Sequence, residues 1–230
     1  MQTVLITGAN RGLGLGFAEQ YGGSGMTVIA TCRNPDEARE LQTLSAERVN
    51  VTIERLDLQS DADIDALARS LESRSVTLDL IVSNAGILQG EEYGDWTRQA
   101  FADTLDTNVS GPAILAQALD EVFSRSGTLV QLSSGLGSLE WGGMGMTDAD
   151  SYSVSKAALN MLTVRLSLSY QGTARCVVAM SPGWVRTEMG GAGANLTVEE
   201  SVERMTSTID SLTAKESGRF LDNEGNPIPW

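Results

Sequence analysis

The chain has 230 residues, of which 41% are hydrophobic, which is enough for one buried core and too apolar for a disordered segment. Its formal net charge is −14, so the phosphate groups of nucleic acid or of an anionic membrane would be repelled, and we expect neither as a partner. The sequence contains no histidine, which excludes Ser-His-Asp triads, zinc held by histidine and general catalysis by imidazole.

Short β-branched apolar runs alternate with longer helix-like segments along the chain. Strands are predicted at residues 3–7, 27–32, 49–56, 78–82, 128–132, 174–180 and 218–221. Helices are predicted at residues 12–22, 36–44, 62–71, 101–123, 152–169 and 198–212, with a bend near Gly111-Pro112 in the longest one. Strands that are apolar on both faces and alternate with helices indicate a parallel sheet between two helical layers. We therefore expect one α/β domain over residues 1–230, with a doubly wound (Rossmann) sheet.

The two cysteines, Cys32 and Cys176, lie in apolar runs, and we expect buried thiols rather than a disulfide or a metal site. The first residues lack the basic region of a signal peptide, and no apolar run approaches the length of a membrane span. These features together predict a soluble cytoplasmic protein.

A glycine-rich turn, Thr7-Gly8-Ala9-Asn10-Arg11-Gly12-Leu13-Gly14, joins the first predicted strand to the first helix. Glycines there permit a tight turn and the close approach of a pyrophosphate, and the helix N-terminus offers free N–H groups. The position of the Gly-x-x-x-Gly-x-Gly spacing favours dinucleotide binding over a purely structural turn. The candidate cofactor-binding residues in it are Gly8, Asn10, Arg11, Gly12, Leu13 and Gly14.

The end of the second predicted strand bears on which dinucleotide binds. Arg33 stands where NAD sites usually carry an acidic residue, and Arg11 lies inside the glycine turn. Two guanidinium groups can flank a 2′-phosphate, although both arginines would also fit as solvated surface charges. The pattern favours NADP(H) over NAD(H).

Tyr152 and Lys156 are four residues apart on one face of a predicted helix. A free tyrosine has a pKa of about 10 and transfers protons poorly near neutrality. A neighbouring ammonium group favours the phenolate and would lower that pKa. The pair can therefore do the proton transfer that histidine does elsewhere.

With these two motifs, the chain resembles the short-chain dehydrogenase/reductase family over nearly its whole length. Further matches, in the family's order, are Asp57-Leu58, Ser83-Asn84-Ala85-Gly86, Asn108, Ser133-Ser134 and 182–187. Within the family, segments 182–191, 199–201 and 225–230 resemble the branch of the carbonyl reductase sniffer and the myxobacterial C-factor. The resemblance implies seven mostly parallel strands in the order 3-2-1-4-5-6-7. It also implies a homodimer or tetramer that pairs through the two long helices.

The resemblance also implies a role for each catalytic residue. Tyr152 would exchange a proton with the substrate oxygen, and Lys156 would lower the pKa of Tyr152 and bind the nicotinamide ribose. Ser134 would orient the substrate oxygen, and Asn108 would hold a water that links Lys156 to solvent. Thr187 would hold the carboxamide. The remaining implied cofactor-binding residues are Asp57, Leu58, Asn84, Ala85, Gly86, Pro182, Gly183 and Val185, together with Tyr152 and Lys156.

Ser134 lies 18 residues before Tyr152, more than the dozen or so usual in the family, so residues 135–150 are predicted to form a longer loop. Trp141, Met144 and Met146 in that loop either wall a substrate pocket or cover the core. Trp184 and Met189 flank the loop after the sixth strand, where this family places substrate. The candidate substrate-binding residues are Ser134, Trp141, Trp184 and Met189.

We therefore expect an NADP(H)-dependent carbonyl reductase or alcohol dehydrogenase that acts on a small-molecule carbonyl or alcohol. The alternative is a nucleotide-binding signalling or regulatory protein of the C-factor type, with incidental turnover. A sugar-nucleotide epimerase is disfavoured, because 230 residues leave little for its extra substrate domain. A pure binding protein has no physical need for Asn108, Ser134, Tyr152 and Lys156 together, and that set favours the enzyme.

Overall fold

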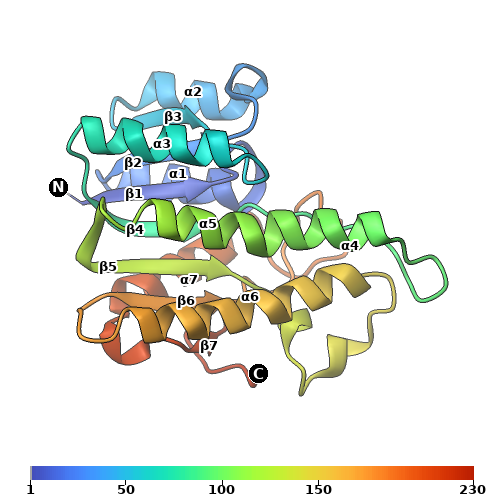
Figure 1. Ribbon diagram of the computed structural model, residues 1–230. Coiled ribbons are helices and arrows are strands. Elements are labelled where there is room, and N and C mark those ends of the chain that lie inside the picture. The colour runs from blue at the N-terminus through green and yellow to red at the C-terminus, as the bar shows by residue number, and fades with distance from the viewer. Residues whose placement is uncertain (1) are drawn as a thin grey trace.

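A computed structural model describes residues 2–230, except the side chains of residues 143 and 144 (Figure 1). Its seven-stranded sheet has the order β3-β2-β1-β4-β5-β6-β7, and every pair of neighbouring strands is parallel. The strands are β1 (Thr3–Thr7), β2 (Thr27–Cys32), β3 (Val51–Arg55), β4 (Leu78–Ser83), β5 (Phe123–Leu132), β6 (Cys176–Met180) and β7 (Phe220–Leu221). The predicted doubly wound fold and strand order are confirmed.

Helices cover both faces of the sheet (Figure 1). One layer holds α1 (Gly12–Gly23), α2 (Arg39–Glu47) and α7 (Val198–Ser211); the other holds α3 (Asp61–Ser73), α4 (Arg98–Leu105), α5 (Gly111–Ala118) and α6 (Asp150–Ser169). Successive side chains of a strand point to opposite faces, so Val4 and Ile6 pack under the first layer and Leu5 under the second. Short 3-10 turns lie at Pro35–Glu37, Gly135–Gly137, Gly142–Gly145 and Ala214–Glu216. No helix within residues 2–230 is long and apolar enough to cross a bilayer.

The prediction of one long helix over residues 101–123 is wrong in its extent. This region forms two helices, α4 and α5, joined by a π-helical turn (Asp106–Ser110) in which the Gly111 N–H donates to the Asp106 carbonyl. The cause is Pro112, which has no N–H to donate and whose ring would crowd the carbonyl of Asn108 in a regular helix.

Phe123, predicted as the end of that helix, begins β5 and pairs with Leu78 of β4. Val122 and Phe123 extend the helical apolar spacing after Leu119, and this concealed the start of the strand. The ring of Phe123 lies over Gly127, where a side chain would collide with it. The polar stretch between them therefore belongs to the strand and not to a loop.

The carboxyl ends of all seven strands point to one edge of the sheet, on the right in Figure 1. The segments that leave β1, β4, β5 and β6 therefore meet there: residues 8–12, 84–87, 134–137 and 182–187. They are the segments that carry most of the predicted site residues. Open parallel sheets bind ligands at this edge.

Candidate active site

The glycine turn after β1 has a backbone that only glycine accommodates. Gly8 and Gly12 have φ angles of +65° and +55°. A Cβ on Gly14 would collide with the carbonyl oxygen of Gly8. No side chain caps α1 at Arg11, and its first turn carries no acidic residue. The positive end of the helix dipole thus faces an open backbone cradle that suits a pyrophosphate.

Asn84 and Ala85, after β4, brace this turn from the side. The Asn84 amide Nδ2 donates to the carbonyls of Thr7 at 2.8 Å and Gly8 at 3.1 Å. The Thr7 hydroxyl oxygen in turn accepts from the backbone N–H groups of Asn84 and Ala85, each at 3.0 Å. The Asn84 side chain, expected at the cofactor, therefore holds the shape of the cradle.

Tyr152 and Lys156 lie on the first turns of α6, and both are buried. The Lys156 Nζ donates to the Leu132 carbonyl at 2.6 Å and lies 5.3 Å from the centre of the Tyr152 ring. Burial lowers the pKa of Lys156 to about 8, because the ammonium group loses solvation.

The pKa of Tyr152 is raised, whereas the sequence predicts that the neighbouring Lys156 lowers it. Burial raises it to about 12, and a hydrogen bond with Ser134 only partly opposes the rise. The cost of desolvating a phenolate, and not the neighbouring ammonium group that the motif by itself suggests, sets the direction of the shift. In this structure the tyrosine is therefore a protonated group near neutrality, with its O–H available to donate.

Ser134 rather than Ser133 faces Tyr152. Ser133 is buried and donates to Asn160 Oδ1 at 2.6 Å, so its hydroxyl is occupied in the interior. Ser134 is half-buried and begins the 3-10 turn Gly135–Gly137. A Cβ on Gly137 would lie 2.8–3.0 Å from the backbone of Lys156 and Ala157, so this turn packs directly on α6. That close packing brings Ser134 to Tyr152.

Asn108 occupies the π-helical turn and is buried. Its Oδ1 accepts from the Ile87 N–H at 2.8 Å, and its Nδ2 donates to the Ile87 carbonyl and to Ser155 Oγ, each at 2.9 Å. Ser155 Oγ donates onward to the Tyr152 carbonyl at 2.7 Å. A Cβ on Gly86 would lie 3.2 Å from Asn108 Oδ1 and 3.7 Å from Lys156 Nζ. Asn108 thus ties the segment after β4 to α6; its predicted water-holding role stays a prediction.

The arginines predicted for a 2′-phosphate are both exposed at this edge of the sheet. Arg11 forms an ion pair with Glu188, and the carbonyl of Arg33 accepts from Arg55 Nη1 at 3.1 Å. Sequence reasoning missed Glu188 and Arg55. Arg55 was detectable, because the last residue of β3 lies beside the end of β2, whereas the contact between Arg11 and Glu188 depends on the folding of a distant loop.

After β3, the two predicted cofactor residues differ in their surroundings. Asp57 is half-buried, and its carboxylate accepts from the Gln59 N–H at 3.1 Å. The Leu58 side chain lies in the core, and a Cβ on Gly111 would approach within 2.5 Å of the Leu58 carbonyl. Of these two residues, only Asp57 therefore presents a polar side chain at this edge of the sheet.

The loop after β6 closes over the glycine turn. A Cβ on Gly12 would lie 3.4 Å from Thr187 Cγ2, and Gly183 has a φ of +81°. The Pro182 carbonyl accepts from Ser201 Oγ at 2.7 Å and from Asn223 Nδ2 at 3.1 Å, which fixes the start of the loop to α7 and the segment after β7. Thr187 is thereby placed beside the cradle.

The apolar candidates for substrate binding are exposed rather than part of the core. Trp184 is 56% exposed, with its indole N–H donating to the Gly190 carbonyl at 2.8 Å. Trp141, Met146 and Met189 are also exposed. The alternative that these side chains cover the core is therefore not supported. The Met144 side chain lies outside the described part of the structure.

A parallel sheet with an uncapped, glycine-lined helix N-terminus and a buried tyrosine–lysine pair at its carboxyl edge defines a Rossmann-fold oxidoreductase class of site. The family model described as short chain dehydrogenase matches residues 2–196. The chain belongs to the short-chain dehydrogenase family.

Particular relatives agree with this assignment. The carbonyl reductase from chicken fatty liver, solved with bound NADPH, is 35% identical with a TM-score of 0.94, covering 100% of this chain and 99% of that one. The carbonyl reductase Sniffer of D. melanogaster is 31% identical with a TM-score of 0.92 and full coverage of both chains. The C-signal protein of Myxococcus xanthus is 35% identical over 162 residues, which are 66% of this chain and 93% of that protein. The predicted resemblance to the sniffer and C-factor branch is confirmed.

Proposed function

We propose that this protein is an NADP(H)-dependent oxidoreductase that interconverts a small carbonyl compound and its alcohol. The observation that carries the proposal is the convergence of half-buried Ser134 with buried Tyr152 and Lys156, at the sheet edge that also holds the glycine cradle. Similarity to a carbonyl reductase solved with NADPH supports it. The whole chain would act as one dinucleotide-binding domain, and its cytoplasmic location stays a prediction.

The residues around the cradle fit a phosphorylated dinucleotide. A pyrophosphate would lie against Gly12 and the first N–H groups of α1, where no Cβ intrudes. Arg11 and Arg33 are exposed and cationic, and a 2′-phosphate would take the place of Glu188 as the anionic partner of Arg11. Lys156 would bind the nicotinamide ribose and Thr187 the carboxamide. When bound, NADPH supplies the hydride that becomes the new C–H bond of the alcohol.

The protein's own part is orientation and proton transfer. Ser134 would donate a hydrogen bond to the substrate carbonyl oxygen, and Tyr152 would pass its phenolic proton to that oxygen as the alcohol forms. A tyrosine with a pKa near 12 is protonated at neutrality, and Lys156 with a pKa of about 8 is then mostly charged. Both states suit reduction of a carbonyl. Trp141, Trp184 and Met189 suggest a substrate with an apolar or aromatic body.

The test is consumption of NADPH and of NADH by the purified protein against aldehydes, ketones, diones and quinones, with Tyr152→Phe run alongside. We expect turnover with NADPH that falls by about 100-fold or more in the variant, since general acid–base groups contribute factors of this size. Equal turnover by Tyr152→Phe would overturn the assigned role. Tight cofactor binding without turnover of any carbonyl would contradict the reductase proposal.

The similarity to C-signal, which extends over 93% of that protein, favours one second candidate. In it, the dinucleotide is a ligand that controls a signalling role, and turnover is incidental. The same experiment separates the two candidates. A signalling protein would bind the dinucleotide equally well with or without the Tyr152 hydroxyl and would turn over no carbonyl at a useful rate.

A further inference from the structure

The loop between β4 and α4 carries two adjacent glutamates with opposite surroundings. Glu91 is only 8% exposed, whereas Glu92 is exposed. A buried carboxylate is unfavourable unless hydrogen-bond donors replace its water. The partners of Glu91 therefore indicate what holds this loop in place.

Glu91 binds the start of α6, 60 residues further along the chain. Its Oε1 accepts from the Ser151 N–H at 2.7 Å, and its backbone carbonyl accepts from the Asp150 N–H at 3.4 Å. The residue at the N-cap position of α6 is Ala149, whose side chain cannot cap. Glu91 supplies the missing cap, and its negative charge suits the positive end of the helix dipole.

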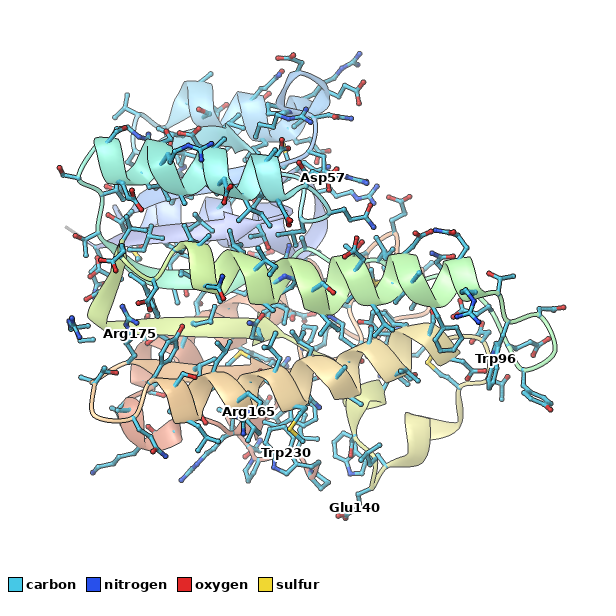
Figure 2. The ribbon with its side chains drawn as sticks, viewed as in Figure 1. Asp57, Trp96, Glu140, Arg165, Arg175 and Trp230 are labelled. Carbon is cyan, nitrogen blue, oxygen red and sulfur yellow. The ribbon has the colours of Figure 1, made fainter. Side chains whose placement is uncertain are left out.

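Two further hydrogen bonds stabilise the first turn of α6. Trp96 Nε1 donates to Asp150 Oδ2 at 2.8 Å, and Ser151 Oγ donates to Thr104 Oγ1 of α4 at 3.1 Å. Figure 2 shows Trp96 between the N-terminal ends of α4 and α6. The first turn of α6 is thus held from the loop and from α4, and the next residue on that turn is Tyr152.

The loop that carries Glu91 also contacts Asn108. That loop begins with residues 84–87, where Ile87 is bound at both backbone atoms to Asn108. Asn108 reaches Tyr152 through Ser155. Glu91 and Asn108 therefore both hold the backbone of the helix turn that carries Tyr152.

We propose that Glu91 is a positioning residue for the reaction: its carboxylate caps α6 and so fixes the Tyr152 hydroxyl beside Ser134. The inference rests on the proposed role of Tyr152 as the proton donor. Proton transfer is sensitive to such placement, because a displacement of ~1 Å can lower a rate by about 100-fold.

Only one of the two carboxylate oxygens of Glu91 caps the helix. Oε1 accepts the Ser151 N–H, whereas Oε2 is buried and has no hydrogen-bond partner among residues 2–230. Glutamine keeps the acceptor oxygen and the length of the side chain, loses the charge and replaces Oε2 with an NH2 group. Glu91→Gln is therefore the conservative variant, Glu91→Ala removes the cap, and Glu92→Ala is the matched control on the neighbouring exposed residue.

Steady-state kinetics and hydrogen exchange are measured on all three variants. We expect Glu91→Ala to lower kcat by about tenfold or more while the dissociation constant for NADPH stays within about twofold, because the cap lies away from the cradle. Glu91→Gln should recover most of that loss, and Glu92→Ala should match the wild type. Amides at 150–154 should exchange faster in Glu91→Ala, and those at 160–169 should not.

The outcomes separate this inference from the proposed function. Wild-type kcat and unchanged exchange at 150–154 in Glu91→Ala would overturn the positioning role. So would a fall in kcat that only follows a smaller folded fraction, or an equal fall in Glu92→Ala. If Tyr152→Phe keeps full activity, the proposed function fails instead, and the exchange measurement still decides whether Glu91 holds the first turn of α6.

Discussion

At the scale of single residues, burial decides the protonation of the two central groups. It raises the pKa of Tyr152 to about 12 and lowers that of Lys156 to about 8. Both shifts disfavour charge in the interior. The chain has no histidine, and in the proposed mechanism these two groups would set the pH range of the reaction.

The pH dependence of carbonyl reduction follows from these directions. We expect kcat/KM to be nearly constant from about pH 6 to 7 and to fall as the pH rises through about 8, where Lys156 loses the charge that would hold the ribose. Tyr152 keeps its proton throughout this range. The profile of Lys156→Arg, whose guanidinium does not deprotonate, should lack that fall. A wild-type profile that stays flat to pH 9.5 would contradict the assignment.

Arg33 governs the choice of cofactor in our proposal. Arg33→Asp places a carboxylate where the 2′-phosphate would bind, so we expect the ratio of kcat/KM for NADPH to that for NADH to fall by about tenfold or more. The control is Arg125→Asp, which makes the same charge change at an exposed residue near the opposite edge of the sheet. An unchanged ratio in Arg33→Asp would show that Arg33 does not bind the phosphate.

At the scale of elements, the 3-10 turn Gly135–Gly137 couples Ser134 to α6. The close approach at Gly137 leaves no space for a methyl group, so Gly137→Ala must move the turn off the helix. We expect a loss of about 1–3 kcal/mol in the free energy of unfolding and a lower kcat, measured by urea unfolding and steady-state kinetics. Gly90→Ala is the control, because a Cβ there would meet only the Asp148 carbonyl at 4.0 Å. Full stability and kcat in Gly137→Ala would refute the coupling.

At the scale of the whole molecule, one helical face is left apolar. Val154, Met161 and Leu168 recur every seven residues on α6 and are 48%, 61% and 47% exposed, and Ile114 of α5 is exposed as well. Both helices belong to the same layer of the fold (Figure 1). Such a stripe is typical of a surface that pairs with another helix. This is the face that we expect in a homodimer or tetramer.

Sedimentation velocity tests that expectation. The wild type should sediment as a dimer or tetramer at micromolar concentration, and Met161→Asp should shift it toward the monomer, because a charge in an apolar interface is unfavourable. Val49→Asp is the control, since Val49 is a fully exposed apolar residue outside this face. A monomeric wild type, or equal sedimentation of Met161→Asp and the wild type, would rule out pairing through α6.

Much of this architecture follows from the sequence alone. Apolar runs with strand periodicity, alternating with helical spacing, determined the class of fold. The largest error is the segment around Pro112 and Phe123; the helix predicted at residues 36–44 is also displaced, since a 3-10 turn (Pro35–Glu37) precedes α2 (Arg39–Glu47). The glycine turn and the Tyr152–Lys156 pair could also be recognised from the sequence. Each is a local pattern in which neighbouring residues fix their own geometry.

The tertiary structure decided what depends on distant segments. It set the direction of the Tyr152 pKa, because burial sums contributions from several elements. It brought Glu188 to Arg11 and Glu91 to the start of α6, over separations of 177 and 60 residues. No periodicity records such contacts, because each arises only when the sheet has gathered the ends of its strands at one edge. The sequence therefore determined the fold and the candidate reacting groups, and the packing of loops on that edge determined how those groups are held and charged.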